Sequence, residues 1–371
     1  MSKTLVIILS ETRAHELTFN NFKKNVLDEL QADLCVCIGV KPDYNYDNPF
    51  YQTAKYRFLY DEPDDFGDAF EYAYQIISKD RPKYECLNNI NALYGKLQHP
   101  QEVSSNVTPY GAHETINLDY EEEEMVHHTN KFPDARWTNQ LYGIKKSFHQ
   151  LVPQHHVNTY KKPLYWREFL KVKDQYLGGI KDELHQHGGS AGILIFFRWF
   201  LLKNLTENKL LDEYDRFIIT RSDFIYQLPH PNVVYMDNSK IWVPDGEYYG
   251  GYTDRHVILS KSQVEPYLNI FTNMVLKSNE YFMKLSSYGD LNLEKLIKFH
   301  LEQNGQQVRE FPYVMYSIRL PNGTTRWSAG TFYHDLGYCI KYNTEYEKST
   351  AYKQQFIKSK MNIRDFYKKI I

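Results

Sequence analysis

The feature that most constrains the fold is an alternation of short apolar runs with segments of helical periodicity near the start of the chain. Three apolar runs occupy residues 4–10, 33–40 and 55–63. Residues 17–30 and 66–79 carry apolar side chains at helical spacing. Continuous apolar runs are typical of parallel strands that are buried on both faces, and helices connect such strands. The pattern predicts an α/β fold with a mostly parallel central sheet and flanking helices.

The alternation returns in the second half of the chain. An apolar run at 216–220 predicts another buried strand, and shorter strands are predicted at 233–236 and 240–244. Apolar spacing at 261–278 and 291–305 predicts two further helices. A chain of 371 residues fits either one large α/β domain with insertions or two domains.

The middle of the chain has a different character. Residues 98–165 are polar and weakly periodic, which predicts an insertion or a small polar subdomain. The stretch 193–202 is apolar but too short to span a membrane, and Arg198 interrupts it, so a buried helix is expected there. From residue 335 onward the chain is charged, rich in tyrosine and predicted to be mostly helical.

Charge and aromatic content limit the classes of partner. The chain has 44 Lys and Arg against 46 Asp and Glu, a formal net charge of −2, so there is no electrostatic case for nucleic acid. Tyrosine is abundant, with 32 residues. Tyrosine-rich surfaces suit flat polar ligands such as bases and sugars, although tyrosine is also a common strand and core residue.

The cysteines and the first residues indicate a compartment. Cys35 and Cys37 share one face of a predicted strand and are poor disulfide partners, and no CxxC pair is present. The apolar run at 4–10 is too short for a signal peptide or a membrane span. A reducing, cytoplasmic location is expected, with no transmembrane segment and with peripheral membrane contact left open.

Polar residues follow the first and third predicted strands. Ser10, Thr12 and Arg13 come after the first strand, and Asp61 ends the third. Ligands of open α/β sheets bind beyond the carboxyl ends of the strands, so these residues are candidates to hold a base, a ribose or a phosphate. Neither GxGxxG nor a P-loop is present. An ordinary ion pair in a loop is the alternative interpretation.

The strongest candidate follows the strand at 216–220, where the chain reads Thr-Arg-Ser-Asp. Asp223 could bind a divalent cation, with the hydroxyl of Ser222 and water completing an oxygen shell. Arg221 could bind phosphates in a bidentate manner. The alternative is a salt bridge from Asp223 to Arg221 or Arg216.

A third candidate lies in residues 243–260. Gly250 and Gly251 permit close approach of the backbone to a ligand. Asp254 and Arg255 follow at once, and the carboxylate could face a sugar or an acceptor. The alternative is a tight turn with a capping aspartate before the helix expected at 261.

Taken in this order, the three stretches resemble those of the GT-A-like glycosyltransferases of viral and bacterial surface-polysaccharide clusters, including WavE-type lipopolysaccharide enzymes. In that group a Thr-Arg-x-Asp stretch is the counterpart of the DxD motif, and a Gly-Gly-x-x-Asp-Arg stretch follows. Here these are Thr220 to Asp223 and Gly250 to Arg255. The resemblance covers roughly residues 1–80 and 205–330, and it implies a cytoplasmic enzyme of a bacterium or of a virus-infected cell.

The resemblance implies transfer of a sugar from a nucleotide-diphosphate sugar to a glycan, polysaccharide or lipid-linked glycan acceptor, assisted by Mn²⁺ or Mg²⁺ bound through Asp223. Asp254 would be the catalytic base of an inverting reaction, with Asp245, Glu247 and Glu294 in reserve. For Glu294 the alternative is an ordinary helical ion pair with Lys298, four residues further on. The remaining expected contacts divide into donor-binding residues, Ser10, Thr12, Arg13, Asp61, Arg221 and Ser222, and substrate-binding residues, Asp245, Glu247, Gly250, Gly251 and Arg255.

Together, the sequence patterns and the resemblance predict four segments. These are a nucleotide-binding α/β half (1–97), an insertion with a helical segment (98–205), a half with the metal and diphosphate motif and the acceptor side (206–335), and a helical segment (336–371).

One departure from the family pattern leaves the metal open. Arg221 stands where a DxD motif has its first carboxylate. Either one carboxylate and the phosphates hold the metal, or the enzyme works without metal and Arg221 supplies the positive charge. A late histidine, His300 or His334, could complete a metal shell, and Arg319 and Arg326 could close over phosphates. The missing carboxylate also permits a second function, a carbohydrate-binding or assembly protein without catalysis.

Overall fold

The computed structural model describes residues 3–79, 171–172, 175–176, 178–180, 189–277, 281, 284, 292–321 and 330–371. The chain divides into two compact units. The first comprises residues 1–64, 194–270 and 292–371, and the second comprises 65–193 and 271–291. The predicted insertion at 98–165 lies outside the described residues, and the four-segment division stays a prediction.

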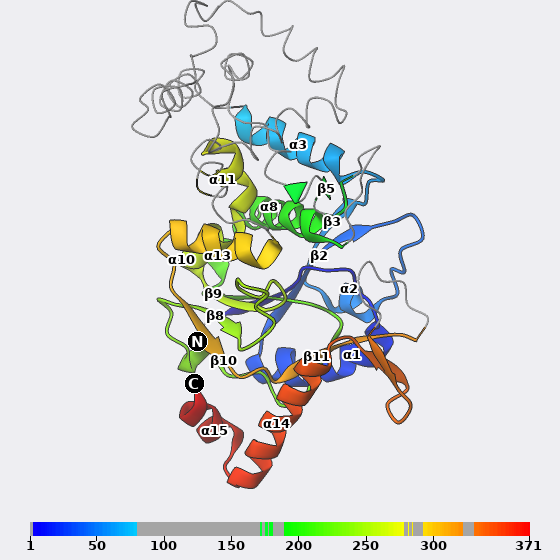
Figure 1. Cartoon of the computed structure of the whole chain (residues 1–371), viewed down its shortest axis with the longest axis vertical. Helices are drawn as coiled ribbons and strands as arrows, with labels where there is room; N and C mark the ends of the chain where they lie inside the picture. Colours follow the sequence, from blue (N-terminus) through cyan, green and yellow to red (C-terminus); the bar gives the residue numbers. More distant parts are fainter. Residues whose placement is uncertain are drawn as a thin grey trace, which may run out of the picture. The chain divides into compact units, whose positions relative to one another are not determined.

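The first unit is built on a seven-stranded sheet with the order β10-β8-β9-β6-β1-β2-β3 (Figure 1). Its strands are β1 (Thr4–Ile8), β2 (Asp33–Val40), β3 (Tyr56–Asp61), β6 (Arg216–Thr220), β8 (Ile241–Pro244), β9 (Val257–Ser260) and β10 (Val308–Phe311). Only β9 in this sheet runs antiparallel to its neighbours. The predicted α/β fold with a mainly parallel sheet is confirmed.

The central strands are the continuous apolar runs of the sequence. Every residue of β1 and of β6 is buried. The two strands are parallel neighbours, with Ile8 opposite Thr220. The residues that follow β1 and β6 therefore emerge side by side at the same edge of the sheet.

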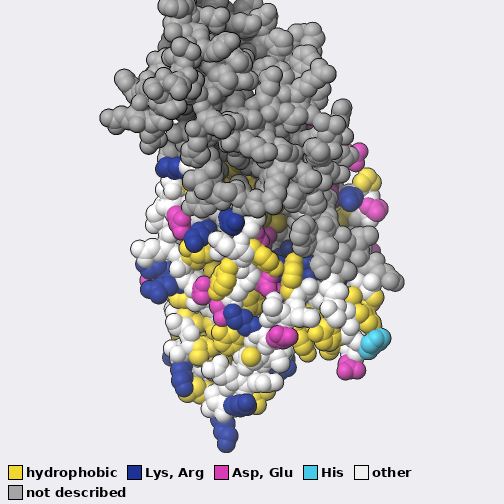
Figure 2. Space-filling view, in the orientation of Figure 1, with side chains coloured by type: hydrophobic (Ala, Val, Ile, Leu, Met, Phe, Trp, Pro, Cys, Tyr) yellow, Lys and Arg dark blue, Asp and Glu magenta, His cyan; other side chains and the backbone are white. Residues whose placement is uncertain are grey.

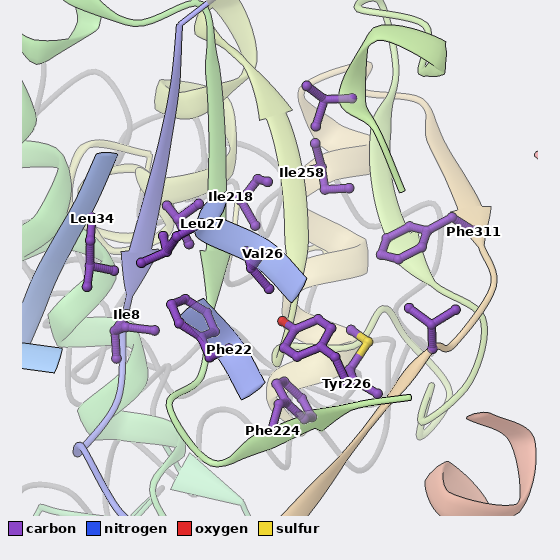
Figure 3. Close-up of a cluster of buried hydrophobic side chains, with 14 of the residues drawn as sticks. Ile8, Phe22, Val26, Leu27, Leu34, Ile218, Phe224, Tyr226, Ile258 and Phe311 are labelled. Carbon is purple, nitrogen blue, oxygen red and sulfur yellow. The ribbon is translucent and has the colours of Figure 1, made fainter. Parts of the chain in front are cut away.

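Helices cover both faces of this sheet. The helix predicted at 17–30 is α1 (His15–Phe22) continued by the π-helix η1 (Lys23–Asp28). Figure 3 shows Phe22 and Val26 of this segment packed beside Ile8 and Ile218 of the strands. The opposite face is covered by α8 (Ala191–Glu207), whose Phe197 ring lies against Gly39 of β2. A buried helix at 193–202 is confirmed.

Among the described residues the other α-helices are α2 (Pro49–Thr53), α3 (Phe66–Ser78), α9 (Leu210–Glu213), α10 (Lys261–Leu268), α11 (Ile270–Leu276), α13 (Leu293–Gln303), α14 (Asn343–Ser359) and α15 (Ile363–Ile370). Across the described ranges, no helix combines the length and apolarity that crossing a membrane requires.

Two sequence predictions were wrong in detail. The strand predicted at 233–236 is the 3₁₀ helix η3 (Val233–Tyr235), because the Asn232 side chain accepts a hydrogen bond from the Val234 N–H and closes a turn. The single helix predicted at 261–278 is divided at Asn269, where the backbone leaves the helical region. Its first half begins at a capping box formed by Ser260 and Gln263, so Asp254 is not the cap.

A second, four-stranded sheet in the same unit has the order β12-β13-β11-β7. Its antiparallel strands are β7 (Phe224–Tyr226), β11 (Met315–Arg319), β12 (Thr331–Tyr333) and β13 (Tyr338–Ile340). Thus β6 ends in the large sheet at Thr220, and β7 begins in the small sheet at Phe224. The chain changes sheets within the three residues Arg221, Ser222 and Asp223.

The second unit is described only in part. Its elements include α3 and the two-stranded pair of β4 (Lys171–Val172) and β5 (Gln175–Tyr176). Helix α3 has Asp65 as its cap, confirming the helix predicted at 66–79. Within this unit the rings of Phe70 and Phe271 meet edge to face at 4.9 Å.

Candidate functional site

Three strands bring charged side chains to the place where the chain changes sheets. Asp223 immediately precedes β7, Arg319 ends β11, and Lys341 follows β13. Adjacent pairing of these strands brings the three positions together, because Ser317 lies opposite Phe224 and Arg319 lies opposite Cys339. The Ile318 N–H also donates to the Asp223 carbonyl at 2.9 Å.

Asp223 is a buried carboxylate held by two arginines. Arg221 donates from Nε to Oδ1 at 2.9 Å and from Nη2 to Oδ2 at 2.8 Å, and Arg319 Nη1 also donates to Oδ2. Burial alone would raise the pKa of Asp223, but the guanidinium groups of Arg221 and Arg319 hold that pKa well below its usual value. The ion pair with Arg221, which the sequence offered as the alternative to a site, is therefore formed.

Positive charge at this place exceeds the negative charge. Arg319 is 2% exposed, and its Nε and Nη2 atoms have no hydrogen-bond partner among the described residues. Lys341 lies with its Nζ atom over the Tyr342 ring, at 4.8 Å from the centroid. Burial and the charges of Arg221 and Arg319 lower the pKa of Lys341 to about 7. We call Arg221, Arg319 and Lys341 the cation cluster; Asp223 is hydrogen-bonded to the two arginines, and it acts on Lys341 only through its charge.

Mn²⁺ or Mg²⁺ does not fit this donor set as it is arranged. Both Asp223 oxygens accept hydrogen bonds from guanidinium groups, and a divalent cation would be repelled by the cation cluster. The described part of the chain contains no group of three or more His, Cys, Asp or Glu that could hold a metal ion. His300 is buried, with its Nε2 atom 2.7 Å from the Pro266 carbonyl. The metal role of Asp223 stays a prediction.

A pocket of about 590 Å³ lies beside the cation cluster. It is lined by Glu247, Tyr248, Tyr249, Gly330, Thr331, Lys341, Tyr342, Asn343 and Thr344. Lys341 belongs both to the pocket wall and to the cation cluster. A ligand in this pocket would therefore meet tyrosine rings and a lysine.

Arg255 is committed to a different buried charge. Its Nη1 atom pairs with Oε1 of Glu345, and its guanidinium stacks on the Tyr342 ring with Cζ 3.9 Å from the centroid. Glu345 also accepts from the Tyr313 hydroxyl at 2.8 Å and from the Ser317 N–H at 2.7 Å. Arg255 therefore supports the pocket residue Tyr342, and its contact with substrate stays a prediction.

Gly251 has a close backbone neighbour, but that neighbour is the protein itself. A Cβ atom at Gly251 would overlap the backbone of Glu294, at the start of α13. The next residue fixes the same contact, since the Tyr252 N–H donates to the Glu294 carbonyl at 3.1 Å. Gly250 has a φ of +84°, which favours glycine at this turn. The two glycines dock this loop onto α13 and place Asp254 near Glu294.

Asp254 and Glu294 form a pair of neighbouring carboxylates. Burial and the charge of Asp254 raise the pKa of Glu294 to about 7. The Asp254 carbonyl accepts a hydrogen bond from Arg198 at 3.4 Å, and Arg198 is 1% exposed on α8. Lys298, which helical spacing would pair with Glu294, lies instead over the Tyr252 ring, at 6.0 Å from its centroid. A carboxyl group with a pKa near 7 can accept or donate a proton at neutral pH.

The loop after β1 is adjacent to the cation cluster. The Ser222 hydroxyl donates to the Glu11 carbonyl at 2.8 Å, and the Ser222 N–H lies 3.5 Å from the Ser10 hydroxyl. Arg13 donates to the Glu11 carboxylate at 2.5 Å. Thr12 is buried, and its hydroxyl accepts from Asn48 at 2.7 Å. Ser10 and Arg13 stay candidates to contact a ligand, whereas Thr12 and Ser222 are engaged with the protein.

Asp61 is remote from the cation cluster. It ends β3, an edge strand three positions from β6 in the sheet order. Strand spacing puts these two strand ends roughly 14 Å apart. Asp61 is exposed, and the structure does not bring it together with Arg221.

Asp245 and Glu247 lie on the opposite side of the unit from Asp61 in strand order, just after β8. Asp245 accepts from the Tyr313 N–H at 2.6 Å and from the Tyr352 hydroxyl at 2.9 Å, so it ties α14 to the sheet. Glu247 lines the pocket and accepts from Tyr249 at 2.5 Å. Only Glu247 of this pair faces the space where a substrate would lie.

Sequence reasoning missed several residues of the site. Lys341 follows the apolar triplet of β13, and the strand-end rule applied to Arg221 could have found it. Glu345 carried no signal, because it sits in a polar helical sequence yet is 1% exposed. His256 was also missed: it contacts Thr220 at 2.9 Å and His230 at 3.2 Å in the core beneath the site. Arg326 lies outside the described residues.

Comparison with solved structures gives a weak structural similarity. No protein-family model and no curated protein matches the chain. Among solved structures, the chain is similar to mouse xyloside xylosyltransferase 1 in its apo form, with 8% sequence identity, a TM-score of 0.29, and coverage of 84% of this chain and 85% of that one. A TM-score this low carries no argument about a site. The α/β fold rests on the sheet described above, and the WavE-type resemblance stays a prediction.

Proposed function

We propose that the chain transfers a sugar from a nucleotide-diphosphate sugar to a glycan acceptor, and that the cation cluster binds the diphosphate. The observation that carries this proposal is the excess of buried positive charge beside a pocket. Arg319 has two guanidinium nitrogens without hydrogen-bond partners, and Lys341 lines the pocket without a carboxylate partner among the described residues. A diphosphate supplies the missing acceptors and negative charge.

In the proposed reaction the diphosphate is the leaving group. The acceptor hydroxyl oxygen forms a bond to the anomeric carbon of the donor sugar, and the bond from that carbon to the diphosphate oxygen breaks. The leaving nucleoside diphosphate gains negative charge, which Arg221, Arg319 and protonated Lys341 stabilise. The hydroxyl proton passes to a carboxylate of the enzyme in an inverting reaction.

The neighbouring carboxylates Asp254 and Glu294 supply that proton acceptor. Burial and the neighbouring charge of Asp254 oppose ionisation of Glu294. Glu294 is the member whose pKa is raised to about 7. Asp254, predicted as the base from the motif, acts with Glu294 in this proposal.

The tyrosines of the pocket suit the sugar and the base of the donor. Tyr248, Tyr249 and Tyr342 line it, and Tyr342 is held in place by stacking on Arg255. Tyrosine offers a flat apolar face and a hydroxyl, which together fit the faces and edges of sugars and bases. The tyrosines do not select among nucleotides or sugars by themselves.

Isothermal titration with UDP, GDP and pyrophosphate, each with EDTA and with Mn²⁺, tests the binding step. Binding in EDTA is expected for all three, because the cation cluster replaces the metal. Absence of binding under every condition would refute the proposal. Binding only with Mn²⁺ would restore the metal role of Asp223 and remove direct binding by Arg221.

Donor turnover tests the reaction step. We expect slow hydrolysis of one nucleotide sugar without acceptor, faster release with a glycan acceptor, and loss of both in an Asp254→Asn, Glu294→Gln double variant. Nucleotide binding without turnover of any donor, or glycan binding alone, would favour the second function, a carbohydrate-binding protein without catalysis.

A further inference from the structure

The last two helices carry a strong positive charge that the rest of the chain does not. Residues 343–371 contain seven Lys and Arg against three Asp and Glu, in a chain of net charge −2. One of the three acids, Glu345, is buried and paired with Arg255. The basic side chains are mostly exposed, including Lys358, Lys360 and Arg364 at the turn between α14 and α15.

Exposed aliphatic side chains lie among these basic residues. Ile357 is 63% exposed and Met361 is 38% exposed, both at the same turn. Val234 of η3 is 73% exposed. Lys368 of α15 lies over the ring of Tyr235, which follows Val234 in the sequence. Val234 and Ile357 are the two most exposed large hydrophobic residues of the described chain. Figure 2 shows Lys and Arg side chains beside hydrophobic ones at the lower end, where α14 and α15 lie.

These aliphatic residues are not needed for packing the helices. Phe366 and Tyr367 of α15 are buried, and Phe356 of α14 meets Phe366 at 5.3 Å. The turn is fixed by Lys360 in the left-handed region, with a φ of 57°. The inner face of the helix pair is therefore complete, and the outward turn presents Ile357 and Met361 on a defined backbone.

We propose that this turn docks on an anionic lipid surface. We call residues 357–364 the basic tip; its exposed side chains are Ile357, Lys358, Lys360, Met361 and Arg364. Lysine and arginine next to a membrane attract anionic headgroups, and aliphatic side chains between them insert into the headgroup and acyl boundary. Binding of single-stranded nucleic acid by base stacking is disfavoured, because the basic tip exposes no aromatic side chain.

Vesicle flotation of the full chain tests the docking. Binding is expected to phosphatidylcholine vesicles that contain phosphatidylglycerol, and not to phosphatidylcholine alone. A K358Q/K360Q/R364Q variant is expected to lose on the order of 100-fold in partition coefficient. Each of the three basic residues contributes about 1 kcal/mol of attraction to an anionic surface. Ile357→Ser is expected to lose about 10-fold, and this loss is expected to persist at high salt.

A control variant tests whether binding depends on the basic tip or only on the total charge of the chain. K41Q/K209Q/K277Q removes three exposed lysines elsewhere and is expected to bind vesicles as the parent does. The proposal is overturned if this control loses as much as the tip variant, if neutral vesicles bind equally well, or if heparin or RNA binds while vesicles do not. All variants change exposed side chains, and thermal unfolding verifies that they fold. Pyrophosphate binding by the tip variant is expected to match the parent, so failure of docking and failure of the proposed function are distinguishable.

Discussion

Two buried charge clusters in the first unit share the same kinds of residue but differ in balance. Glu345 accepts from Arg255, Tyr313 and Ser317, and its cluster leaves little charge unsatisfied. Asp223 is the carboxylate for Arg221 and Arg319, with Lys341 nearby, and two nitrogens of Arg319 are left without partners. A buried charge cluster whose charges are all paired stabilises the fold. A cluster with unpaired positive charge can be stabilised by a bound anion.

The difference lies in the cost of burial. Removing charges from water costs several kcal/mol per ion unless each finds its counter-charge and its hydrogen bonds. The Arg255–Glu345 pair meets both conditions within the protein. The cation cluster does not, and burial together with the charges of Arg221 and Arg319 lowers the pKa of Lys341. The four predictions below test this contrast, from the largest expected effect to the smallest.

Glu345→Gln should cause the largest loss of stability. It removes the nearest counter-charge of the buried Arg255 and leaves only the more distant carboxylates of Glu247, at 3.5 Å, and Asp254, at 3.9 Å. Breaking a buried ion pair costs up to about 3–5 kcal/mol. The free energy of unfolding in urea measures this. Glu347→Gln, an exposed acid on the same helix, serves as the control and should change stability by less than about 0.5 kcal/mol. If Glu345→Gln and Glu347→Gln lowered stability equally, the Glu345 cluster would not stabilise the fold as proposed.

Arg319→Met should lower anion affinity without lowering stability, unlike Glu345→Gln. The free energy of unfolding should be unchanged or higher, because a partly unpaired buried cation is replaced by an apolar side chain while Asp223 keeps Arg221. Pyrophosphate affinity should fall by roughly 10- to 100-fold, the value of one or two charge-assisted hydrogen bonds. Arg309→Met, at an exposed position on β10, provides the comparison for both measurements. A strong loss of stability with intact binding would make Arg319 structural.

Lys341 should make anion binding depend on pH. Its pKa is about 7 in the folded protein, so the ammonium group is deprotonated above that pH, and pyrophosphate affinity should fall by up to about tenfold per pH unit.

The same group should change stability with pH in the opposite direction. Between pH 7 and about 10.4 the unfolded lysine binds more protons than the folded one, so the free energy of unfolding rises with pH. Lys341→Gln should flatten both curves. Unchanged slopes would place their origin elsewhere.

Asp61→Asn should have the smallest effect. Asp61 is exposed on an edge strand, so both stability and UDP affinity should stay within about 0.5 kcal/mol of the parent. Calorimetric titration beside the Arg319 variant gives the comparison. A large loss of UDP affinity would show that the donor reaches across the sheet to β3, and that the site extends beyond the cation cluster and its pocket.

The sequence predicted the strands well where each carried its own signal. β6 was expected at 216–220 and is Arg216–Thr220, and β2 was expected at 33–40 and is Asp33–Val40. Both are continuous apolar runs that a buried strand requires. Prediction failed at 233–236, where a hydrogen bond from the Val234 N–H to the side chain of Asn232 favours a turn over a strand.

The sequence by itself determined that charge stands at the end of a buried strand, at Arg221 and Asp223, because apolar runs and their ends are local features. Only the tertiary structure decided what that charge meets. Arg319 and Lys341 come from strands about a hundred residues further along, and antiparallel pairing of β7, β11 and β13 brings them to Asp223. The same holds for Asp254 and Glu294, which Gly251 joins by its close contact with α13. Whether a buried charge is paired depends on residues that are close in space but distant in sequence, and the local sequence does not reveal them.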